Sequence, residues 1–364
     1  MLELMGAGFL SILNVESIII IVIGVGLGLI FGAVPGLTAA MAIAICLPIT
    51  FGMSPVNGMA LLTGLYIGGV SGGFIPAMLL NIPGTPSSIV TTFDGYPMAQ
   101  RGEAGKAFFL TIFFSFFAGL LSILILIFVS PLLASVALEF TPIEYFAVTI
   151  FALTMISSLA GNSILKGIIS ALIGVFLAMI GTAPIDSFPR FTFGISELEA
   201  GLDVLPVLIG LFAISEILKS AESRKNEIEK KVNASYRFRD MGVTFVDLFK
   251  QKWNWLRSTM IGVGVGILPG LGGSAANIMS YVAAKNQSKN PEEFGKGSEE
   301  GIVAAESSNN AAIGGSLVPL LSLGIPGDAV TALLIGGLML HGLNLGRSCL
   351  NRTGTSFTGF LLHS

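Results

Sequence analysis

Eight apolar segments, each at least eighteen residues long, constrain the fold of this chain more than any other feature of its sequence. They lie at 18–52, 58–80, 107–135, 143–160, 165–182, 201–218, 258–284 and 301–345. A helix of about 20 apolar residues spans the hydrocarbon core of a bilayer. Only 11% of the residues are charged, whereas an ordinary soluble domain has about 25%. The sequence therefore predicts an all-α polytopic membrane protein that crosses the lipid bilayer several times.

The remaining composition argues against several kinds of site. A formal net charge of -3 does not indicate nucleic-acid binding. Two cysteines and two histidines are too few for a disulfide framework or a zinc cluster. AGKA at 104–107 lacks the upstream glycine and the Ser/Thr of a phosphate-binding loop. We therefore expect no cofactor.

An internal repeat is the most informative pattern. GLIFGAVPGL at 28–37 and GVGVGILPGL at 262–271 share five residues in register at a constant offset of 234. GGFIPAMLLNIPGTP at 72–86 aligns with GGSLVPLLSLGIPGD at 314–328 after one insertion, which pairs their Ile-Pro-Gly triplets. Each half of the chain therefore contains two Pro-Gly breaks in the same order.

The distribution of basic residues predicts how the repeats are oriented. Ten of the nineteen Lys and Arg residues lie between Lys219 and Arg257, so this loop is predicted to be cytoplasmic. Residues 1–17 contain no Lys or Arg, which predicts an outside start. The 27 residues between Arg257 and Lys285 are too few for two crossings. These observations favour an inverted structural repeat with re-entrant hairpins and broken helices, as in secondary transporters.

The same features divide the chain into four parts. Residues 1–218 form the first membrane repeat with its following helices, and residues 258–346 form the core of the second repeat. Residues 219–257 form a cytoplasmic basic loop that ends in FVDLFKQKWNWLR, which is interpreted as an interfacial amphipathic helix. A solvated linker is the alternative. Residues 347–364 form an atypical polar tail where the first repeat continues with apolar segments, so we expect a truncated C-terminus.

The Pro-Gly breaks are the candidate binding site. An unpaired backbone group costs several kcal/mol in hydrocarbon, so a broken membrane helix indicates a cavity or a ligand. The N-terminus of a half-helix suits a carboxylate, and freed carbonyls suit Na⁺. A Pro-kinked helix end at the membrane surface is the alternative. The predicted substrate-binding residues are Thr38, Asn81, Gly84, Thr85, Ser87, Ser274, Asn277, Ser307, Asn309, Asn310 and Gly327.

Acidic residues in the same segments are the candidates for cation binding. An acidic side chain at the bilayer centre costs about 2.5–3.5 kcal/mol. Glu306 and Asp328 are therefore predicted to face a cavity, to pair, or to coordinate Na⁺. Capping of a helix near the headgroups is the alternative for Glu306. Asp94, beside Gly95, is interpreted as part of a cytoplasmic turn.

Several long motifs occur in the order typical of one family. These are FGAVPGLTAAMAIAICLPITF, GLYIGGVSGGFIPAMLLNIPGTPSS, FDGYPMAQRGEAGKA, GILPGLGGSAAN, AAESSNNAAIGGSLVPLLSLGIPGD and LMLHGLN. Together they resemble the large membrane subunit of tripartite tricarboxylate transporters, from about residue 18 to residue 344.

This resemblance implies a multi-pass protein of the bacterial cytoplasmic (inner) membrane. It further implies symport of citrate or related carboxylates, driven by Na⁺ or H⁺ as the coupling ion. The partners it implies are a periplasmic substrate-binding protein and a small membrane subunit, and the mechanism is an elevator or rocking motion. Self-association into a homo-oligomer stays open. A carboxylate or ion channel is one alternative. A membrane-embedded enzyme is another, although His341 is the only imidazole that could serve it.

Overall fold

The computed structural model describes residues 12–139, 164–183, 188–202 and 245–343, with isolated positions between 141 and 150 and between 207 and 218. Three helical stretches in this part of the chain are long and apolar enough to cross a membrane: Val15–Ala33, Pro55–Leu80 and Ala104–Val136. The predicted all-α membrane protein is thereby confirmed. The predicted segments 143–160 and 201–218, the loop 219–244 and the tail 347–364 lie largely or wholly outside the described residues.

The first half of the chain contributes α2 (Val15–Ala33), α3 (Ala39–Cys46), η1 (Leu47–Gly52), α4 (Pro55–Gly72), α5 (Phe74–Leu80), η2 (Pro86–Ser88), α6 (Ile89–Gln100) and α7 (Ala104–Leu138). Next come α9 (Ile164–Ala178), the antiparallel strands β1 (Gly181–Thr182) and β2 (Pro189–Arg190), and η3 (Ser196–Leu198). The second half contributes α12 (Phe245–Lys250), α13 (Lys252–Ile267), α14 (Gly272–Gln287), η6 (Pro291–Glu293), α15 (Glu299–Leu323) and α16 (Ala329–Leu340).

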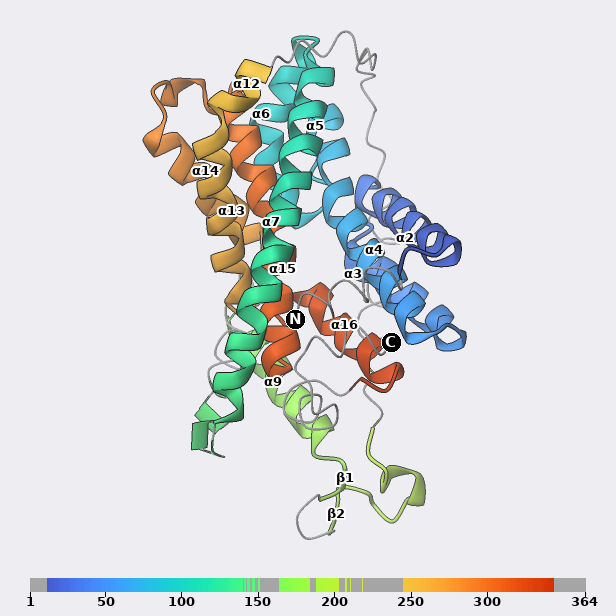
Figure 1. Cartoon of the computed structure of the whole chain (residues 1–364). Helices are drawn as coiled ribbons and strands as arrows, with labels where there is room; N and C mark the ends of the chain where they lie inside the picture. Colours follow the sequence, from blue (N-terminus) through green and yellow to red (C-terminus); the bar gives the residue numbers. More distant parts are fainter. Residues whose placement is uncertain are drawn as a thin grey trace.

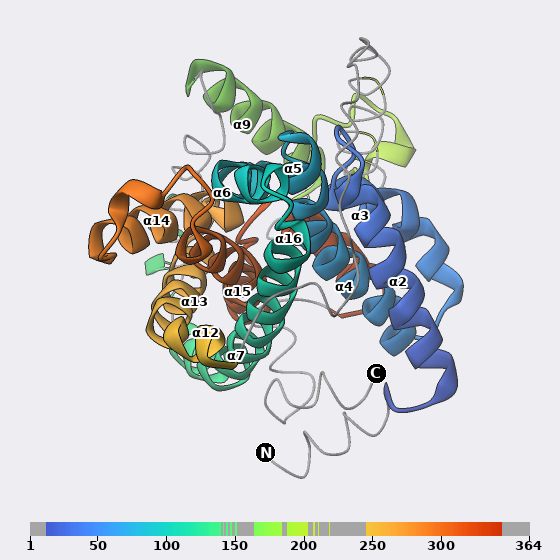
Figure 2. The same cartoon turned by 90° about the horizontal axis from the view of Figure 1, so that it is seen from above.

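The helices form two groups that meet along α15 and α16. Figure 1 shows α2, α3 and α4 on one side and α7 with α12 to α15 on the other, and the view from above in Figure 2 agrees. α16 joins the groups, because Leu333, Leu334 and Leu338 pack in one apolar cluster with residues of α3 and α4 and with Leu320 of α15.

Glycines at four-residue spacing explain two of the closest helix pairs. A Cβ atom on Gly28 of α2 would lie 2.6 Å from the carbonyl oxygen of Leu65 in α4. A Cβ atom on Gly266 of α13 would lie 2.7 Å from the carbonyl oxygen of Ala312 in α15. Only glycine allows these backbones to approach so closely. The equivalent glycines of the two sequence repeats therefore serve equivalent helix pairs.

The Pro-Gly breaks are present in the structure as interruptions between helices. Gly36 separates α2 from α3 with φ 88°, and Gly270 separates α13 from α14 with φ 83°. α5 ends at Asn81 with φ 60°, and α15 ends at Gly324 with φ 73°. At both ends the backbone takes the left-handed conformation, which Gly and Asn adopt more readily than other residues.

The helix ends before the two Ile-Pro-Gly triplets also share a hydrogen-bond pattern. The amide of Ile82 donates to the carbonyl of Pro76 at 3.4 Å, and the amide of Ile325 donates to the carbonyl of Pro319 at 3.2 Å. In both halves the amide that follows the left-handed residue bonds to the carbonyl six positions back and closes the last turn of the helix. The broken helices predicted from the sequence therefore end alike in both halves.

Candidate functional site

The polar block of α15 is entirely buried. Glu306 to Asn310 are at most 5% exposed, although they lie in the middle of a 25-residue helix whose N-cap is Ser298. Glu306 therefore does not cap the helix. Thr91 of α6 donates a hydrogen bond to Glu306 Oε1, and Glu306 Oε2 has no partner among the described residues. A buried carboxyl with one donor is poorly satisfied.

The first turn of α14 lies against this block. No side chain of the described residues caps α14. The first backbone N–H groups of this helix are therefore available to a ligand. Asn309 is 1% exposed, and neither Oδ1 nor Nδ2 makes a hydrogen bond to a described residue. Its Oδ1 lies 2.8 Å from the position that a Cβ atom would take on Gly273. The Asn309 amide is thus aimed at the N-terminus of α14.

The break after α5 reaches the same place from the first half of the chain. Asn277 in α14 donates from Nδ2 to the backbone carbonyl of Ser87 in η2, and its Oδ1 has no partner in the described part of the chain. The Cβ atom of Ser87 lies 3.4 Å from the position of a Cβ atom on Gly273. The structure therefore brings together three predicted site residues, Ser87, Asn277 and Asn309.

The backbone amides of the first Ile-Pro-Gly break have internal partners. Gly84 donates to the carbonyl of Gly73 at 3.3 Å, and Thr85 donates to Ser88 Oγ at 3.2 Å in a capping box. The hydroxyls of Thr85 and Ser87 are 3.1 Å apart. In this conformation the backbone amides of the break are occupied by partners within the break and α4–α5.

The second break is closed by Asp328. Asp328 is the N-cap of α16, where its Oδ1 accepts from the amide of Thr331 at 2.8 Å. Its Oδ2 accepts from the phenol of Tyr66 in α4. The carbonyl of Gly327 accepts from the amide of Gly270 at 2.8 Å, which ties the two breaks of the second half together. Tyr66 was not singled out from the sequence, although a tyrosine inside an apolar helix needs a polar partner.

Other predicted site residues have structural partners. Asn310 donates to Ser115 Oγ in α7 and accepts from Ser71 Oγ in α4, each at 2.8 Å. Thr38 caps α3, because its Oγ1 accepts from the amide of Met41 at 3.1 Å. These contacts hold helices in place, and they leave little free hydrogen-bonding capacity for a ligand.

The remaining predicted residues differ in burial. Ser307 is fully buried, and its hydroxyl has no partner among the described residues. Ser274 is half-buried in the first turn of α14. Asn81 is exposed and forms the left-handed end of α5.

One interpretation from the sequence is wrong. Asp94 does not belong to a turn, because it lies inside α6, where it is only 1% exposed. Its partners lie some 200 residues away in the chain, so no local pattern could have indicated its burial.

The acidic residues do not gather into a cluster for a multivalent metal. In the described residues, no group of three or more His, Cys, Asp or Glu side chains could hold a metal ion. A monovalent cation near Glu306 would therefore rely mainly on amide, hydroxyl and carbonyl oxygens.

Comparison with known proteins gives a family match over nearly the whole chain. The Tripartite tricarboxylate transporter TctA family matches residues 18–364. The chain is 39% identical over 354 residues to an Agrobacterium vitis protein described as an uncharacterized 52.8 kDa protein in the TAR-I ttuC' 3' region, covering 97% of this chain and 70% of that protein. A second Agrobacterium vitis protein, an uncharacterized protein in the TAR-II ttuC' 3' region, is 44% identical over 97 residues, which are 27% of this chain and 40% of that protein. No solved structure matches the chain.

Proposed function

The chain belongs to the tripartite tricarboxylate transporter TctA family, and we propose that it is the permease subunit of an ion-driven secondary transporter that imports tricarboxylates or related carboxylates such as citrate. The family is a transporter family, so the protein is not an enzyme. In this proposal a periplasmic binding protein delivers the substrate and a small membrane subunit accompanies the chain in the bacterial inner membrane.

The observation that carries the proposal is the free hydrogen-bonding capacity around the start of α14. Asn309 has two amide atoms without a described partner, and Asn277 has one. Burying a polar group without a partner costs about 1–3 kcal/mol, so these side chains fit a polar ligand that completes their bonds. The uncapped N-terminus of α14 favours an anion there. A carboxylate accepts from the donors, which are Asn309 Nδ2 and the N–H groups of α14, whereas the free Oδ1 atoms of Asn277 and Asn309 suit a coupling cation.

Glu306 supplies the argument for a coupling cation. Its carboxyl is fully buried three residues before Asn309, so both side chains lie on the same face of α15. A carboxylate and a multiply charged substrate repel each other strongly at low dielectric. A bound Na⁺ or proton would reduce this repulsion. We expect Na⁺, with Glu306 and Asp328 as the candidate ligands. Glu306 has an oxygen without a described hydrogen-bond partner, whereas Asp328 already accepts from the amide of Thr331.

The inverted repeat is part of the same proposal. The matched glycine pairs and the two similar helix ends described above support an internal repeat, and the charge distribution supports opposite orientations. A repeat of this kind typically places the substrate near the membrane midplane, where discontinuous helices meet. Alternating exposure of this site to the two sides would produce uptake.

The test is uptake of radiolabelled citrate into liposomes that contain the complete transporter with its binding protein. The variants are Asn309→Ala and Asn277→Ala, and the control is Asn286→Ala on the exposed side of α14. A hydrogen bond to a charged group contributes about 1.5–3 kcal/mol, so Asn309→Ala should raise KM for citrate about tenfold or more. Asn277→Ala removes a free acceptor and should raise the Na⁺ concentration that supports half-maximal uptake. The control should behave like the wild type.

Two results would contradict the proposal. If Asn309→Ala takes up citrate with the same KM as the control, the substrate carboxylate does not bind at this position. Flux that never saturates and ignores an imposed Na⁺ or pH gradient would indicate a channel instead of a carrier.

A further inference from the structure

The second fully buried carboxyl of the described chain, Asp94, is satisfied in a different way from Glu306. Asp94 Oδ1 accepts hydrogen bonds from the amides of Gly295, Gly297 and Ser298, each at 2.8 Å. Its Oδ2 accepts from the phenol of Tyr281 at 2.8 Å. Four donors replace the water that the carboxylate loses, so Asp94 is stable as a buried anion.

The loop that surrounds Asp94 is shaped for an anion. Gly295 has φ 85° and Gly297 has φ 101°, a backbone conformation that other residues rarely adopt. Alternating left-handed residues turn successive N–H groups toward one point. The phenol of Tyr281 adds a fourth donor from α14.

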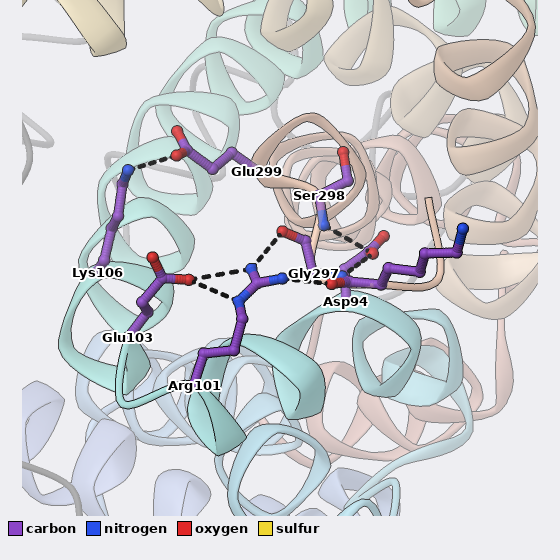
Figure 3. A network of polar contacts seen from close by, with 8 residues as sticks. Asp94, Arg101, Glu103, Lys106, Gly297, Ser298 and Glu299 are labelled. Carbon is purple, nitrogen blue, oxygen red and sulfur yellow. Dashed lines mark hydrogen bonds and ion pairs between the residues drawn. The ribbon is translucent and has the colours of Figure 1, made fainter. Parts of the chain in front are cut away.

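Charged side chains reinforce the loop from outside (Figure 3). Arg101 donates to the carbonyl of Lys296 at 2.6 Å and to the carbonyl of Gly297 at 3.0 Å, and it pairs with Glu103 at 3.0 Å. Lys106 of α7 forms an ion pair with Glu299 in the first turn of α15. We call Asp94, Tyr281 and residues 295–298 the clasp.

The clasp and the candidate site are built on the same three helices. α6 carries Asp94 and, one turn earlier, Thr91, which bonds Glu306. α14 carries Tyr281 and, one turn earlier, Asn277, which bonds the carbonyl of Ser87. α15 begins at the clasp and continues to the polar block. Each helix therefore has one contact in the clasp and one in the site.

We propose that Asp94 is a positioning residue that fixes α6, α14 and α15 as one unit, so that Ser87, Asn277 and Asn309 keep their relative positions while the carrier moves. This inference depends on the proposed carboxylate site. It adds that the first-half helix α6 travels with the second-half helices α14 and α15, and that the clasp acts on the site only through them.

The test compares three perturbations of the clasp. Asp94→Ala removes the anion, Asp94→Asn keeps its shape and one acceptor, and Gly301→Ala changes no polar group but places a Cβ atom against Asp94 Oδ2. Gly264→Ala is the matched control, because nothing lies within 4 Å of a Cβ atom there. We expect KM for citrate to rise about tenfold in Asp94→Ala and Gly301→Ala and less in Asp94→Asn, with no change in the control.

A second measurement reads the geometry without transport. The Cβ positions of residues 87 and 273 are 3.4 Å apart, close to the separation found in disulfides. Ser87→Cys with Gly273→Cys, in a chain without its two native cysteines, should form a disulfide on mild oxidation. Adding Asp94→Asn or Gly301→Ala should slow this cross-linking several-fold, whereas Gly264→Ala should not.

The two measurements separate the inference from the proposed function. Slower cross-linking in the clasp variants supports the inference, whether or not the wild-type chain transports citrate. A wild-type chain that does not transport citrate would overturn the proposed function and leave the inference standing. Unchanged cross-linking rates and an unchanged KM in Asp94→Asn and Gly301→Ala would overturn the inference, as would a loss confined to the maximal rate.

Discussion

The phenol of Tyr66 in α4 donates a hydrogen bond to Asp328, which caps α16. A helix of the first half thus holds a helix terminus of the second half. The equivalent cap in the first half is Thr85, a neutral residue that needs no such partner. The additional carboxylate in the second half is therefore balanced by a donor from the opposite half, which explains why a tyrosine is buried inside an apolar helix.

Substitution of Asp328 separates its capping role from a role in cation binding. Asn caps helices about as well as Asp, so Asp328→Asn should change the free energy of unfolding by less than about 1 kcal/mol, whereas Asp328→Ala should cost about 1–2 kcal/mol. If Asp328 is a Na⁺ ligand, Asp328→Asn should also raise the Na⁺ concentration that supports half-maximal uptake. Thermal unfolding in detergent and Na⁺-dependent uptake measure the two effects. Unchanged Na⁺ dependence would leave Asp328 with the structural role only.

Glycine substitutions should show the same pattern in both halves. Gly28→Ala and Gly266→Ala each place a Cβ atom within 2.7 Å of a backbone oxygen of the neighbouring helix. Overpacking of this kind costs about 1–3 kcal/mol or more. Gly26→Ala and Gly264→Ala, two residues away on the same helices, meet nothing within 4 Å and should be neutral or stabilising by up to about 1 kcal/mol.

Melting temperatures of the four alanine variants provide the measurement. We expect Gly28→Ala and Gly266→Ala to have lower melting temperatures than the wild type. Gly26→Ala and Gly264→Ala should melt at or above the wild-type temperature. A stable Gly28→Ala variant would contradict the close contact of α2 with α4, and a stable Gly266→Ala variant would contradict that of α13 with α15.

Asn81 gives a test of backbone conformation against ligand binding. Its φ of 60° is left-handed, so Asn81→Ala should cost about 1–2 kcal/mol of stability and Asn81→Gly should cost little. The same thermal measurement compares them. Because Asn81→Gly removes the amide without straining the backbone, a raised KM in this variant would assign the side chain to the substrate. Equal stability of the alanine and glycine variants would contradict the left-handed helix end.

The sequence could predict the features that are encoded locally. The Pro-Gly breaks appear where their residues predicted them, because Pro and Gly act on the backbone within a few positions. The glycines of α2 and α13 stand at the four-residue spacing that is typical of closely packed helices, and the structure uses them in this way.

The contacts between the halves could not be predicted in this way. Tyr66 and Asp328 are 262 positions apart, and Asp94 and Gly295 are 201 apart. One local signal was nevertheless present. Thr38 stands at the N-cap of α3, whereas the aligned position of the second half is Gly272, which has no side chain to cap α14. The difference between GLTAA and GLGGS in the two repeats thus indicated the free helix terminus.

Trp253 tests whether the segment before α13 lies at the membrane surface. The predicted amphipathic helix is divided in the structure, with α12 ending at Lys250 and α13 beginning at Lys252. Phe249 and Trp253 are 68% and 71% exposed, and the Lys252 ammonium lies 4.1 Å from the centre of the Phe249 ring. Exposed aromatic rings beside a cation are typical of the headgroup region.

The chain has two tryptophans, so Trp255→Phe leaves Trp253 as the only indole fluorophore. In liposomes, lipids brominated near the headgroups should quench its fluorescence more strongly than lipids brominated deep in the acyl chains, and aqueous iodide should quench it weakly. Trp253→Phe is the matched control, because Trp255 packs against the apolar cluster of Leu110 and Phe114 and should be shielded from all three quenchers. Strong quenching of Trp253 by iodide, without quenching by either lipid, would show that this segment is a solvated linker.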